Sequence, residues 1–287
     1  MSFQCIEAGR NFRPDRHLPF LIGEQRFGWI RAEDAGLLAR WPQVFELPGA
    51  AVRLAPALDS VERRSAALDS VCKDLAESGH IRGWRNERYT IRNSFSEQPL
   101  ALIERAAARF FGTLTFGVHA NGIVAGVDAR DHGQPRLWIA RRSASKFIDP
   151  GLFDNVVGGG IGWGYGIVET LVKECWEESG IPAQLAGHAT AGRSIQLLAE
   201  IPEGVQSEQI FVHDLPLPAD FRPSGQDGEV SEHRLVSIDE ALALIANGEM
   251  TIDASLVTLD WLLRTGHIDP ASPDLAGIDT LFNAVAD

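Results

Sequence analysis

The stretch GGGIGWGYGIVETLVKECWEESGI, from Gly158 to Ile181, decides the expected fold and chemistry of this chain. Several glycines lead directly into a helical segment in which Glu174, Glu177 and Glu178 are spaced i, i+3 and i+4. That spacing places three carboxylates on one face of a helix. Like charges so close together repel unless a cation lies between them, and oxygen ligands suit Mg²⁺ or Mn²⁺. The stretch therefore predicts a metal site beside a phosphate-binding loop.

A solvated helix face is the competing interpretation, because clustered glutamates on a helix usually point to water. The rest of the helix argues against it, since apolar residues cover much of the remaining surface: Leu171, Val172, Cys175 and Trp176. Glutamates on such a packed helix have little room to reach bulk water. Gly180 is expected to end the helix in a left-handed conformation.

The same stretch resembles the Nudix box, whose pattern is G-x5-E-x7-R-E-U-x-E-E-x-G-U, with U an aliphatic residue. Aligned on Gly159, the chain matches the first glycine, the last three glutamates and the final glycine–aliphatic pair: Gly159, Glu174, Glu177, Glu178, Gly180 and Ile181. The resemblance implies that Glu174, Glu177 and Glu178 hold the metal ion of a Nudix enzyme.

Two positions depart from the Nudix pattern. Tyr165 stands where the family has its first glutamate, and Lys173 stands where it has an arginine. Glu169 and Lys173, four residues apart, offer a substitute ion pair in the favourable order. Metal binding is expected to survive these departures, whereas they leave the catalytic rate open.

The chain has 287 residues and changes character near Gly112, which suggests two domains. Residues 1–112 are expected to form a smaller α/β domain, with strands in 20–30, 44–54 and 84–91. Helices are expected in 32–41, 59–78 (with Asp59 as N-cap) and 100–111. Residues 113–287 are expected to begin with a hairpin of strands 113–120 and 122–129 that turns at Asn121-Gly122. Further strands are expected in 136–141, 153–157, 194–201, 209–215 and 229–237, and two closing helices in 238–246 and 252–264.

This layout matches a Nudix fold, an α/β/α sandwich around a mixed sheet. The resemblance extends to FGVHANGIV, LWIARRSASKFIDPGLFDNVVGGGI and DGEVSEHRL, which begin at Phe116, Leu137 and Asp227. These segments are similar to the MutT-like Nudix group related to fungal thiamin pyrophosphokinase fusions and their plant and bacterial relatives. In that group a distinct N-terminal domain precedes the Nudix domain, here residues 113–287.

A distant carboxylate often completes the site in Nudix enzymes, and the segment DGEVSEH offers Glu229 for that role. Glu232 on the same segment is the alternative, and a solvated loop glutamate is the non-functional interpretation. Basic residues upstream of the glycines, Arg141, Arg142 and Lys146, could meet a substrate phosphate. Arg141 and Arg142 would point to opposite faces of a strand, so at most one reaches it, and Arg141 is put forward. The backbone of Gly158, Gly159 and Gly160 is expected to approach the phosphates closely.

Composition limits the other functions. A formal net charge of −13 argues against non-specific nucleic-acid binding. The three cysteines (Cys5, Cys72 and Cys175) are scattered, without CxxC spacing, so neither a zinc site nor a disulfide framework is indicated, and Cys72 is expected in a core. No apolar run approaches the ~20 residues that span a bilayer, and the N-terminus lacks a signal-peptide core. We expect a soluble cytoplasmic protein without membrane partners, and a homodimer only as a family property.

The leading hypothesis is a Mg²⁺-dependent diphosphohydrolase, for which Mn²⁺ is an alternative metal. Glu177, Glu178 and Glu229 would be catalytic, and Gly158, Gly159, Gly160 and Arg141 would bind a small-molecule diphosphate. The resemblance suggests a nucleoside-diphosphate-X or thiamin-diphosphate-like substrate that yields a monophosphate. A Nudix-fold binding or regulatory protein that has lost catalysis is the alternative, motivated by Tyr165 and Lys173. An isoprenoid-diphosphate isomerase is disfavoured, because no paired cysteine and glutamate can be identified for proton transfer.

Overall fold

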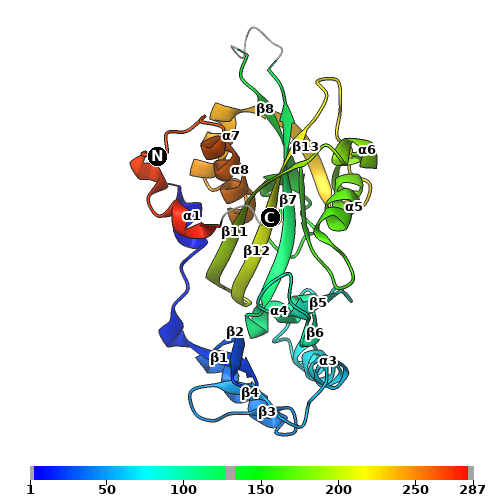
Figure 1. Cartoon of the computed structure of the whole chain (residues 1–287), viewed down its shortest axis with the longest axis vertical. Helices are drawn as coiled ribbons and strands as arrows, with labels where there is room; N and C mark the ends of the chain where they lie inside the picture. Colours follow the sequence, from blue (N-terminus) through cyan, green and yellow to red (C-terminus); the bar gives the residue numbers. More distant parts are fainter. Residues whose placement is uncertain (1–2, 127–132, 284–287) are drawn as a thin grey trace.

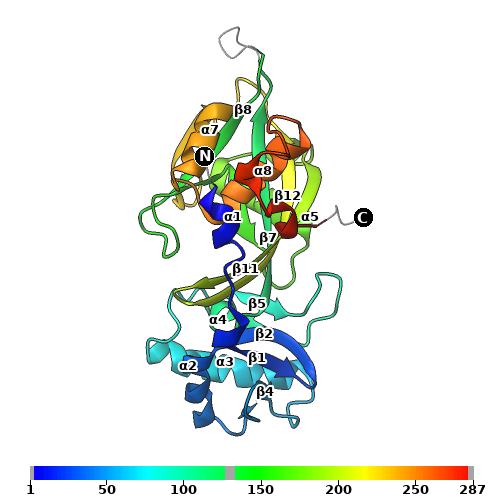
Figure 2. The ribbon, with the colours of Figure 1, turned by 90° about the vertical axis from the view of Figure 1, so that its left-hand side faces the viewer.

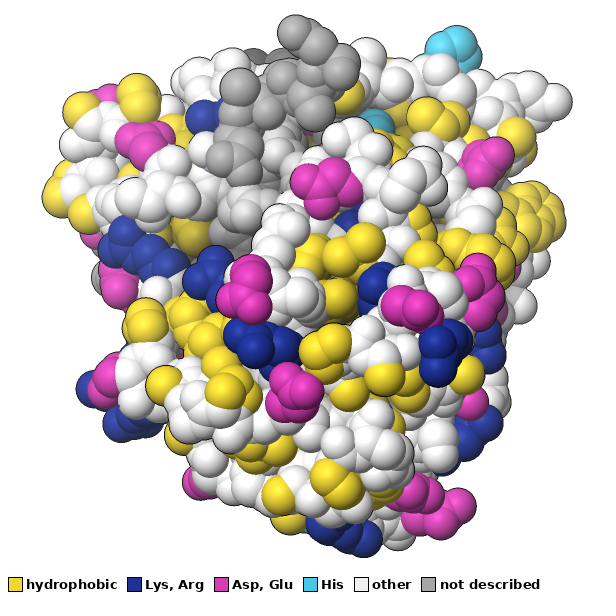
Figure 3. All heavy atoms as spheres, turned by 60° about the horizontal axis from the view of Figure 1, so that its bottom comes forward, with side chains coloured by type: hydrophobic (Ala, Val, Ile, Leu, Met, Phe, Trp, Pro, Cys, Tyr) yellow, Lys and Arg dark blue, Asp and Glu magenta, His cyan; other side chains and the backbone are white. Residues whose placement is uncertain are grey.

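A computed structural model describes residues 3–126 and 133–283, whose elements are arranged in two tiers along the longest axis (Figure 1). The lower tier is formed by the N-terminal part of the chain, and the upper tier by a large sheet flanked by helices. The predicted α/β class, with a separate N-terminal α/β region, is confirmed. On the face drawn in Figure 3, Lys and Arg side chains are interspersed with Asp and Glu side chains.

The lower tier contains a four-stranded sheet of order β2-β1-β4-β3 and a separate β5-β6 hairpin. Its strands are β1 (His17–Ile22), β2 (Gln25–Arg31), β3 (Phe45–Glu46), β4 (Val52–Leu54), β5 (Arg88–Ile91) and β6 (Ala101–Glu104). Its helices are α2 (Ala32–Ala35), α3 (Val61–Glu77) and α4 (Arg105–Phe111), with 3₁₀ turns at Pro14–Arg16 and Gly36–Arg40.

Two predictions in this tier are wrong in detail. The N-cap of α3 is Ser60, whose hydroxyl accepts the Arg63 N–H at 3.2 Å, and not Asp59. The helix predicted for 100–111 is a strand followed by a short helix, β6 and α4. All four residues of β6 are buried and pair with β5, so the sheet satisfies the backbone groups that a helix would otherwise bond internally.

The upper tier is built on an eight-stranded sheet of order β13-β8-β7-β12-β11-β14, with β10 paired to β7 and β9 to β8. The β7–β12 pair is parallel and the other pairs are antiparallel, so the sheet is mixed. Its strands are β7 (Leu114–Val124), β8 (Arg136–Arg142), β9 (Phe153–Asn155), β10 (Val157–Gly160), β11 (Thr190–Ile201), β12 (Gly204–Pro216), β13 (Val230–Ser237) and β14 (Phe282–Asn283).

Helices cover both faces of this sheet, which confirms the predicted α/β/α sandwich (Figures 1 and 2). One face carries α5 (Ile167–Ser179) and α6 (Ala183–Ala186). The other carries α7 (Ile238–Ala246), α8 (Ile252–Arg264) and, from the start of the chain, α1 (Gln4–Ala8). Short 3₁₀ turns follow at Pro273–Leu275 and Ile278–Leu281. Residues Phe3, Cys5 and Ile6 thus pack in the upper tier, although they precede the lower one in sequence.

The predicted hairpin at Asn121-Gly122 is wrong, because β7 runs through both residues without a turn. Gly122 pairs with Trp138 of β8 on one side and with Leu215 of β12 on the other. The Asn121 side chain is 2% exposed and donates to the Asp214 carboxylate at 3.3 Å. Because the Asn121 side chain is buried and hydrogen-bonded inside a central strand, this residue does not form the expected turn. The end of the second predicted strand, residues 127–129, lies outside the described residues.

Apolar side chains gather into three cores, one in the lower tier and one on each face of the upper sheet. Cys72 lies in the lower core, as predicted, Cys5 in the core under α8, and Cys175 in the core under α5. Among the described residues, no helix combines the length and the apolar character that crossing a membrane requires.

Candidate active site

Helix α5 presents the three glutamates between two glycines that fix its ends. At its start, the carboxylate of Glu169 accepts a hydrogen bond from the Gly166 N–H at 2.9 Å, which satisfies one of the free amides of the first turn. At its end, Gly180 adopts φ +61°, the left-handed cap that the sequence predicts. The helix therefore holds its acidic stripe in a fixed register above the sheet.

Lys173 does not pair with Glu169, contrary to the expectation from their spacing. Its ammonium group donates to Glu177 at 2.6 Å and to Glu174 at 3.2 Å. Glu169 is already engaged by the Gly166 N–H, so it supports the helix start and leaves Lys173 to the acidic stripe. The departure of Lys173 from the Nudix pattern therefore places a cation directly against two of the predicted metal ligands.

Glu178 is the most buried of the three glutamates, with 6% of its surface exposed. One of its carboxylate oxygens accepts the Gly158 N–H at 2.8 Å, which ties α5 to the glycine strand. Burial and the negative charge of Asp154 raise the pKa of Glu178 to about 8, against the opposing effect of the Gly158 hydrogen bond. A cation near this carboxylate would relieve that unfavourable charge.

Glu174 and Glu177 differ in how far they extend from the sheet. The Glu174 side chain is 15% exposed and packs on Gly159, where a Cβ atom would lie 2.5 Å from its Cδ. Burial raises the pKa of Glu174, although Lys173 opposes the shift. The Glu177 side chain is 38% exposed and is held by Lys173. Two of the three carboxylates thus face the glycine strand, and the third lies toward solvent.

The donor set fits a hard divalent cation in its chemistry. Glu174 and Glu178 supply oxygen atoms that are largely withdrawn from water, and the negative charge of Glu174 contributes to the raised pKa of Glu178. Within residues 3–126 and 133–283, no three Asp, Glu, His or Cys side chains converge to hold a metal ion together. The metal-binding role of Glu174, Glu177 and Glu178 stays a prediction, in which Glu177 has to leave Lys173.

The three glycines form a strand, β10, whose neighbours leave no room for side chains. Gly158, Gly159 and Gly160 pair with β7 at His119, Val118 and Gly117. A Cβ atom would meet the His119 ring at Gly158, the Glu174 carboxyl group at Gly159 and the Tyr89 hydroxyl group at Gly160. The expected close approach of this backbone to substrate phosphates stays a prediction, and the Gly158 N–H is already bonded to the Glu178 carboxylate.

A cavity of about 150 Å³ opens beside β10, between the two tiers. Gly158, Gly159 and Gly160 line it from the upper tier, and the loop between β8 and β9 crosses it. Phe147 of that loop, 44% exposed, reaches the lower tier, since a Cβ atom on Gly83 would lie 2.9 Å from its ring. Residues of both tiers therefore line the cavity.

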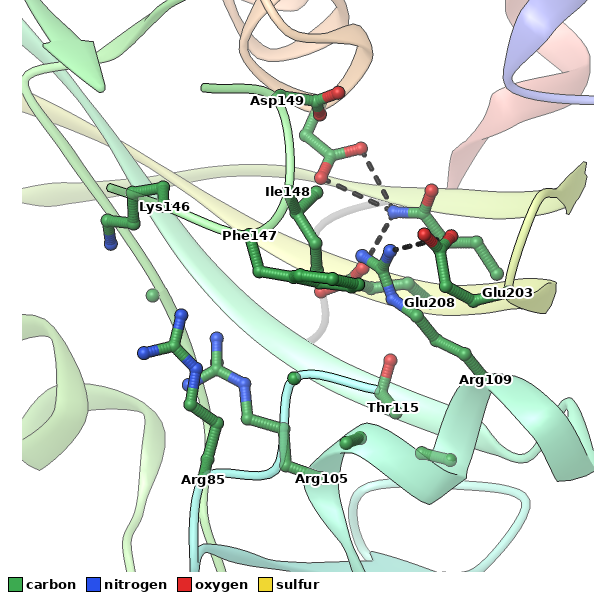
Figure 4. Close-up of a pocket in the computed structure, with 18 of the residues that line it drawn as sticks. Arg85, Arg105, Arg109, Thr115, Lys146, Phe147, Ile148, Asp149, Glu203 and Glu208 are labelled. Carbon is green, nitrogen blue, oxygen red and sulfur yellow. Dashed lines mark hydrogen bonds and ion pairs between the residues drawn. The ribbon is translucent and has the colours of Figure 1, made fainter. Parts of the chain in front are cut away.

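Three cationic side chains converge on one side of the cavity (Figure 4). Arg85 and Arg105 come from the lower tier and lie side by side, with their guanidinium groups toward the ammonium group of Lys146. Lys146 also acts electrostatically on Glu178, and Arg105 on Glu174; in each case the cation opposes the raised pKa of the glutamate. The cations that line the cavity therefore act directly on the charges of the glutamates of α5.

Arg141, the predicted phosphate ligand, does not reach this cavity. Its guanidinium group donates to Glu232 at 3.0 Å and to the Gly151 carbonyl at 2.8 Å, and it lies over the Phe153 ring. Arg142, on the opposite face of β8, lines the cavity and donates to Asp154 at 2.8 Å. Arg141 and Arg142 point to opposite faces of β8, as expected, but Arg142 and not Arg141 faces the cavity.

The structure separates the two candidate distal carboxylates. Glu229 lines the cavity, forms an ion pair with Lys146 and lies 3.9 Å from the Arg85 guanidinium group. Glu232 pairs with Arg141 outside it. Of the two, only Glu229 is placed where a distal carboxylate would have to act, and its catalytic role stays a prediction.

The opposite wall of the cavity is acidic and polar. The Gln206 amide donates to Glu208 at 3.0 Å and to Asp253 at 3.2 Å, so it bridges the two carboxylates. Burial, followed by the charge of Glu208, raises the pKa of Asp253 to about 7. The Thr113 hydroxyl, on a residue 1% exposed, also lines the cavity and has no hydrogen-bond partner in the part of the chain that the structure describes. This wall is suited to hydrogen-bond donors or positive charge.

Comparison with known proteins decides the family. Residues 121–256 match the family model described as "NUDIX domain", and residues 1–115 match "Domain of unknown function (DUF4743)". The chain is 38% identical over 259 residues to Nudix hydrolase 24, chloroplastic, of Arabidopsis thaliana, a match that covers 89% of this chain and 70% of the relative. The chain belongs to the Nudix hydrolase family.

A second plant relative and a solved structure are also similar to this chain. Nudix hydrolase 20, chloroplastic, of Arabidopsis thaliana is 36% identical over 265 residues, covering 89% of this Nudix hydrolase and 70% of the relative. The crystal structure of DR0079 from Deinococcus radiodurans is similar over 61% of this chain and 99% of that chain, with a TM-score of 0.46 and 24% identity. The domain boundary expected after residue 112 stays a prediction.

Several residues at the cavity of this Nudix hydrolase carry no signal in the sequence, because only the fold brings them together. Arg85 and Arg105 carry no local motif, and only the junction of the tiers places them beside β10. Lys146 was noted as basic but not put forward. Asp154 follows the conspicuous Phe153 at the start of β9, and its proximity to Glu178 depends on sheet pairing. Tyr165, at the position of the missing family glutamate, is 52% exposed and replaces none of that residue's charge.

Proposed function

We propose that this Nudix hydrolase uses Mg²⁺, or Mn²⁺, to hydrolyse a diphosphate linkage in a small metabolite and to release a monophosphate. Family membership identifies a diphosphohydrolase, and divalent metals are general in the family. The observation that carries the proposal is the pairing of buried Glu174 and Glu178 with a cavity that holds Arg85, Arg105 and Lys146.

The proposed roles follow from the positions of the side chains. Glu174, Glu177 and Glu178 would hold the metal ion, which supplies charge neutralisation and a more acidic bound water. Glu178, whose burial makes it a stronger base than an ordinary carboxylate, or Glu229 would take the proton of the attacking water. Glu229 becomes available only when Lys146 releases it.

Replacement of Glu178 tests this site assignment. Glu178→Gln keeps the shape of the side chain and an oxygen that can accept the Gly158 N–H, so the fold is expected to persist. Loss of the charge should lower Mg²⁺-dependent turnover by at least about 10²-fold. The measurement is phosphate or monophosphate release, with circular dichroism as a check on folding. Glu77→Gln, on the exposed end of α3, is the matched control and should retain activity. Full Mg²⁺-dependent release by Glu178→Gln would show the assignment to be wrong.

The organic group of the substrate would meet the acidic wall formed by Glu208 and Asp253. A thiamin-diphosphate-like substrate carries a cationic ring and amino donors that such a wall can accept, whereas the sugar of a nucleoside-diphosphate-X offers neutral hydroxyls. The wall therefore supports the first class over the second. Assays with thiamin diphosphate and with ADP-ribose, in Mg²⁺ and at alkaline pH, separate them by kcat/KM.

A ligand-binding protein without catalysis is the second candidate, favoured by the grip of Lys173 on Glu174 and Glu177. It predicts that the same diphosphates bind in isothermal titration but give no product. Turnover in the parallel assay excludes it. A cytoplasmic location, a homodimer and the absence of nucleic-acid partners are part of the same proposal, and fractionation, light scattering and gel-shift measurements test them.

A further inference from the structure

Arg85 and Arg105 flank the β5–β6 hairpin of the lower tier, and both line the cavity. Arg85 precedes β5, and its backbone N–H donates to the buried Glu104 carboxylate at 2.8 Å. Arg105 follows β6 directly, and its backbone N–H donates to the Glu87 carbonyl at 2.8 Å. The β5–β6 hairpin pairs Arg88 with Glu104, so the two arginines lie at the same open end of this hairpin.

Among the described residues, the three cations form direct ion pairs with two carboxylates on this side of the cavity, Glu87 and Glu229. Arg105 pairs with Glu87 at 2.7 Å, while Arg85 and Lys146 share one carboxylate, that of Glu229. The Lys146 side chain is only 11% exposed. Burial and the nearby arginines lower the pKa of its ammonium group, although Glu178 opposes this. Three cations brought together against two carboxylates leave a place for an anion.

The position of these cations identifies the anion. They lie beside the glycine strand, where Gly158, Gly159 and Gly160 line the same cavity. An arginine presents paired N–H donors that match two oxygens of a phosphate group, and a buried lysine adds a point charge.

We propose that Arg85 and Arg105 of the N-terminal region, together with Lys146, form a phosphate-binding site for the substrate, so that this region supplies half of the active site. The inference rests on the function proposed above and deepens it, because it assigns a role to residues 1–115. A phosphate bound there competes with Glu229 for Arg85 and Lys146. Binding of substrate therefore releases Glu229 toward the reacting centre.

The test uses inorganic pyrophosphate, titrated calorimetrically into the full chain in metal-free buffer. We expect wild-type protein to bind it and Arg85→Ala to bind it about 10- to 100-fold more weakly, as loss of a charge-assisted hydrogen-bond pair predicts. Arg105→Gln should weaken binding in the same direction. Arg88→Ala is the matched control, since Arg88 lies exposed on the same hairpin, outside the cavity.

Glu229→Gln provides a result of opposite sign, because it removes the carboxylate that competes with the anion and should tighten pyrophosphate binding. A merely structural role of these residues would not produce opposite effects from Arg85→Ala and Glu229→Gln. Wild-type protein that fails to bind pyrophosphate, or an Arg85→Ala variant that binds as wild type, overturns the inference. If Arg85→Ala binds normally while Glu178→Gln loses turnover, this inference fails and the proposed function stands. If wild type turns over no diphosphate but Arg85 controls pyrophosphate binding, the proposed function fails instead.

Discussion

The carboxyl group of Asp253 links the cavity to the stability of the whole chain. Its pKa is about 7 in the folded protein and 3.8 for an ordinary aspartate, chiefly because of burial. Since the folded pKa is the higher one, rising pH between about 4 and 7 releases a proton from the unfolded state first and favours unfolding. Asp253→Asn removes this effect. We expect its unfolding free energy, relative to wild type, to be higher at pH 8 than at pH 5 by on the order of 2 kcal/mol.

Urea unfolding at the two pH values measures this difference. Asp220→Asn, at an exposed position, is the control and should shift the unfolding free energy equally at both pH values. An Asp253→Asn variant that behaves like this control would contradict the charged, buried environment described for Asp253.

At the same scale, spacing and the Nudix resemblance were enough to name the glutamates of α5, the glycines and Glu229 as candidates, with Glu232 as the alternative to Glu229. Their roles stay predictions. The choice between Arg141 and Arg142 could not be made in this way, because it depends on which face of β8 meets the cavity. That face is set by the pairing of β8 with β9 and β13, of which β13 is distant in sequence.

Among the elements, α5 depends on Gly180 for its ending. The residue adopts φ +61°, and a Cβ atom there would lie 2.7 Å from the Ser224 carbonyl oxygen. Gly180→Ala is therefore expected to destabilise the protein by about 1–2 kcal/mol from the left-handed backbone alone, and by more from the contact. Gly36→Ala is the control, since φ is −61° there and no atom lies within 4 Å of the added Cβ. Equal midpoints of denaturation for the two variants would refute the expectation.

Element prediction succeeded where the signals are local. The bounds of α7 and α8 agree with the sequence expectation, because apolar periodicity and N-caps at Ser237 and Thr251 lie within each helix. It failed at β6 and at Asn121-Gly122 in β7. Both failures concern buried strands whose backbone groups pair with other strands, β5 for β6 and both β8 and β12 for β7, so neither local propensity nor a turn dipeptide could decide them.

For the molecule as a whole, contacts between the tiers predict cooperative unfolding. Phe95 of the lower tier packs edge-on against Phe116 and Phe211, with ring centroids 5.3 and 5.4 Å apart. We expect a single transition in differential scanning calorimetry. Phe95→Ala should lower the stability by on the order of 2 kcal/mol, since the side chain is only partly buried. Two well-separated transitions in the wild-type protein would contradict this coupling.

The arrangement of the tiers was also the least predictable property from the sequence. The chain pattern indicated two regions, but not that α1 returns to pack beside α8 or that a cavity forms where the regions meet. Such junctions are made by side chains with no shared motif. Nothing in the sequence distinguishes Arg105 and Lys146 from other basic residues, and only the assembled fold places both at the same cavity.

The distribution of the cysteines gives this protein a set of built-in probes. Each of the three cores contains one thiol, Cys5, Cys72 or Cys175, and burial raises the pKa of all three. A thiol that is neutral and enclosed reacts with an alkylating reagent only when its surroundings open. Three peptides in one mass spectrum can therefore time the opening of three separate regions, without any label having been introduced.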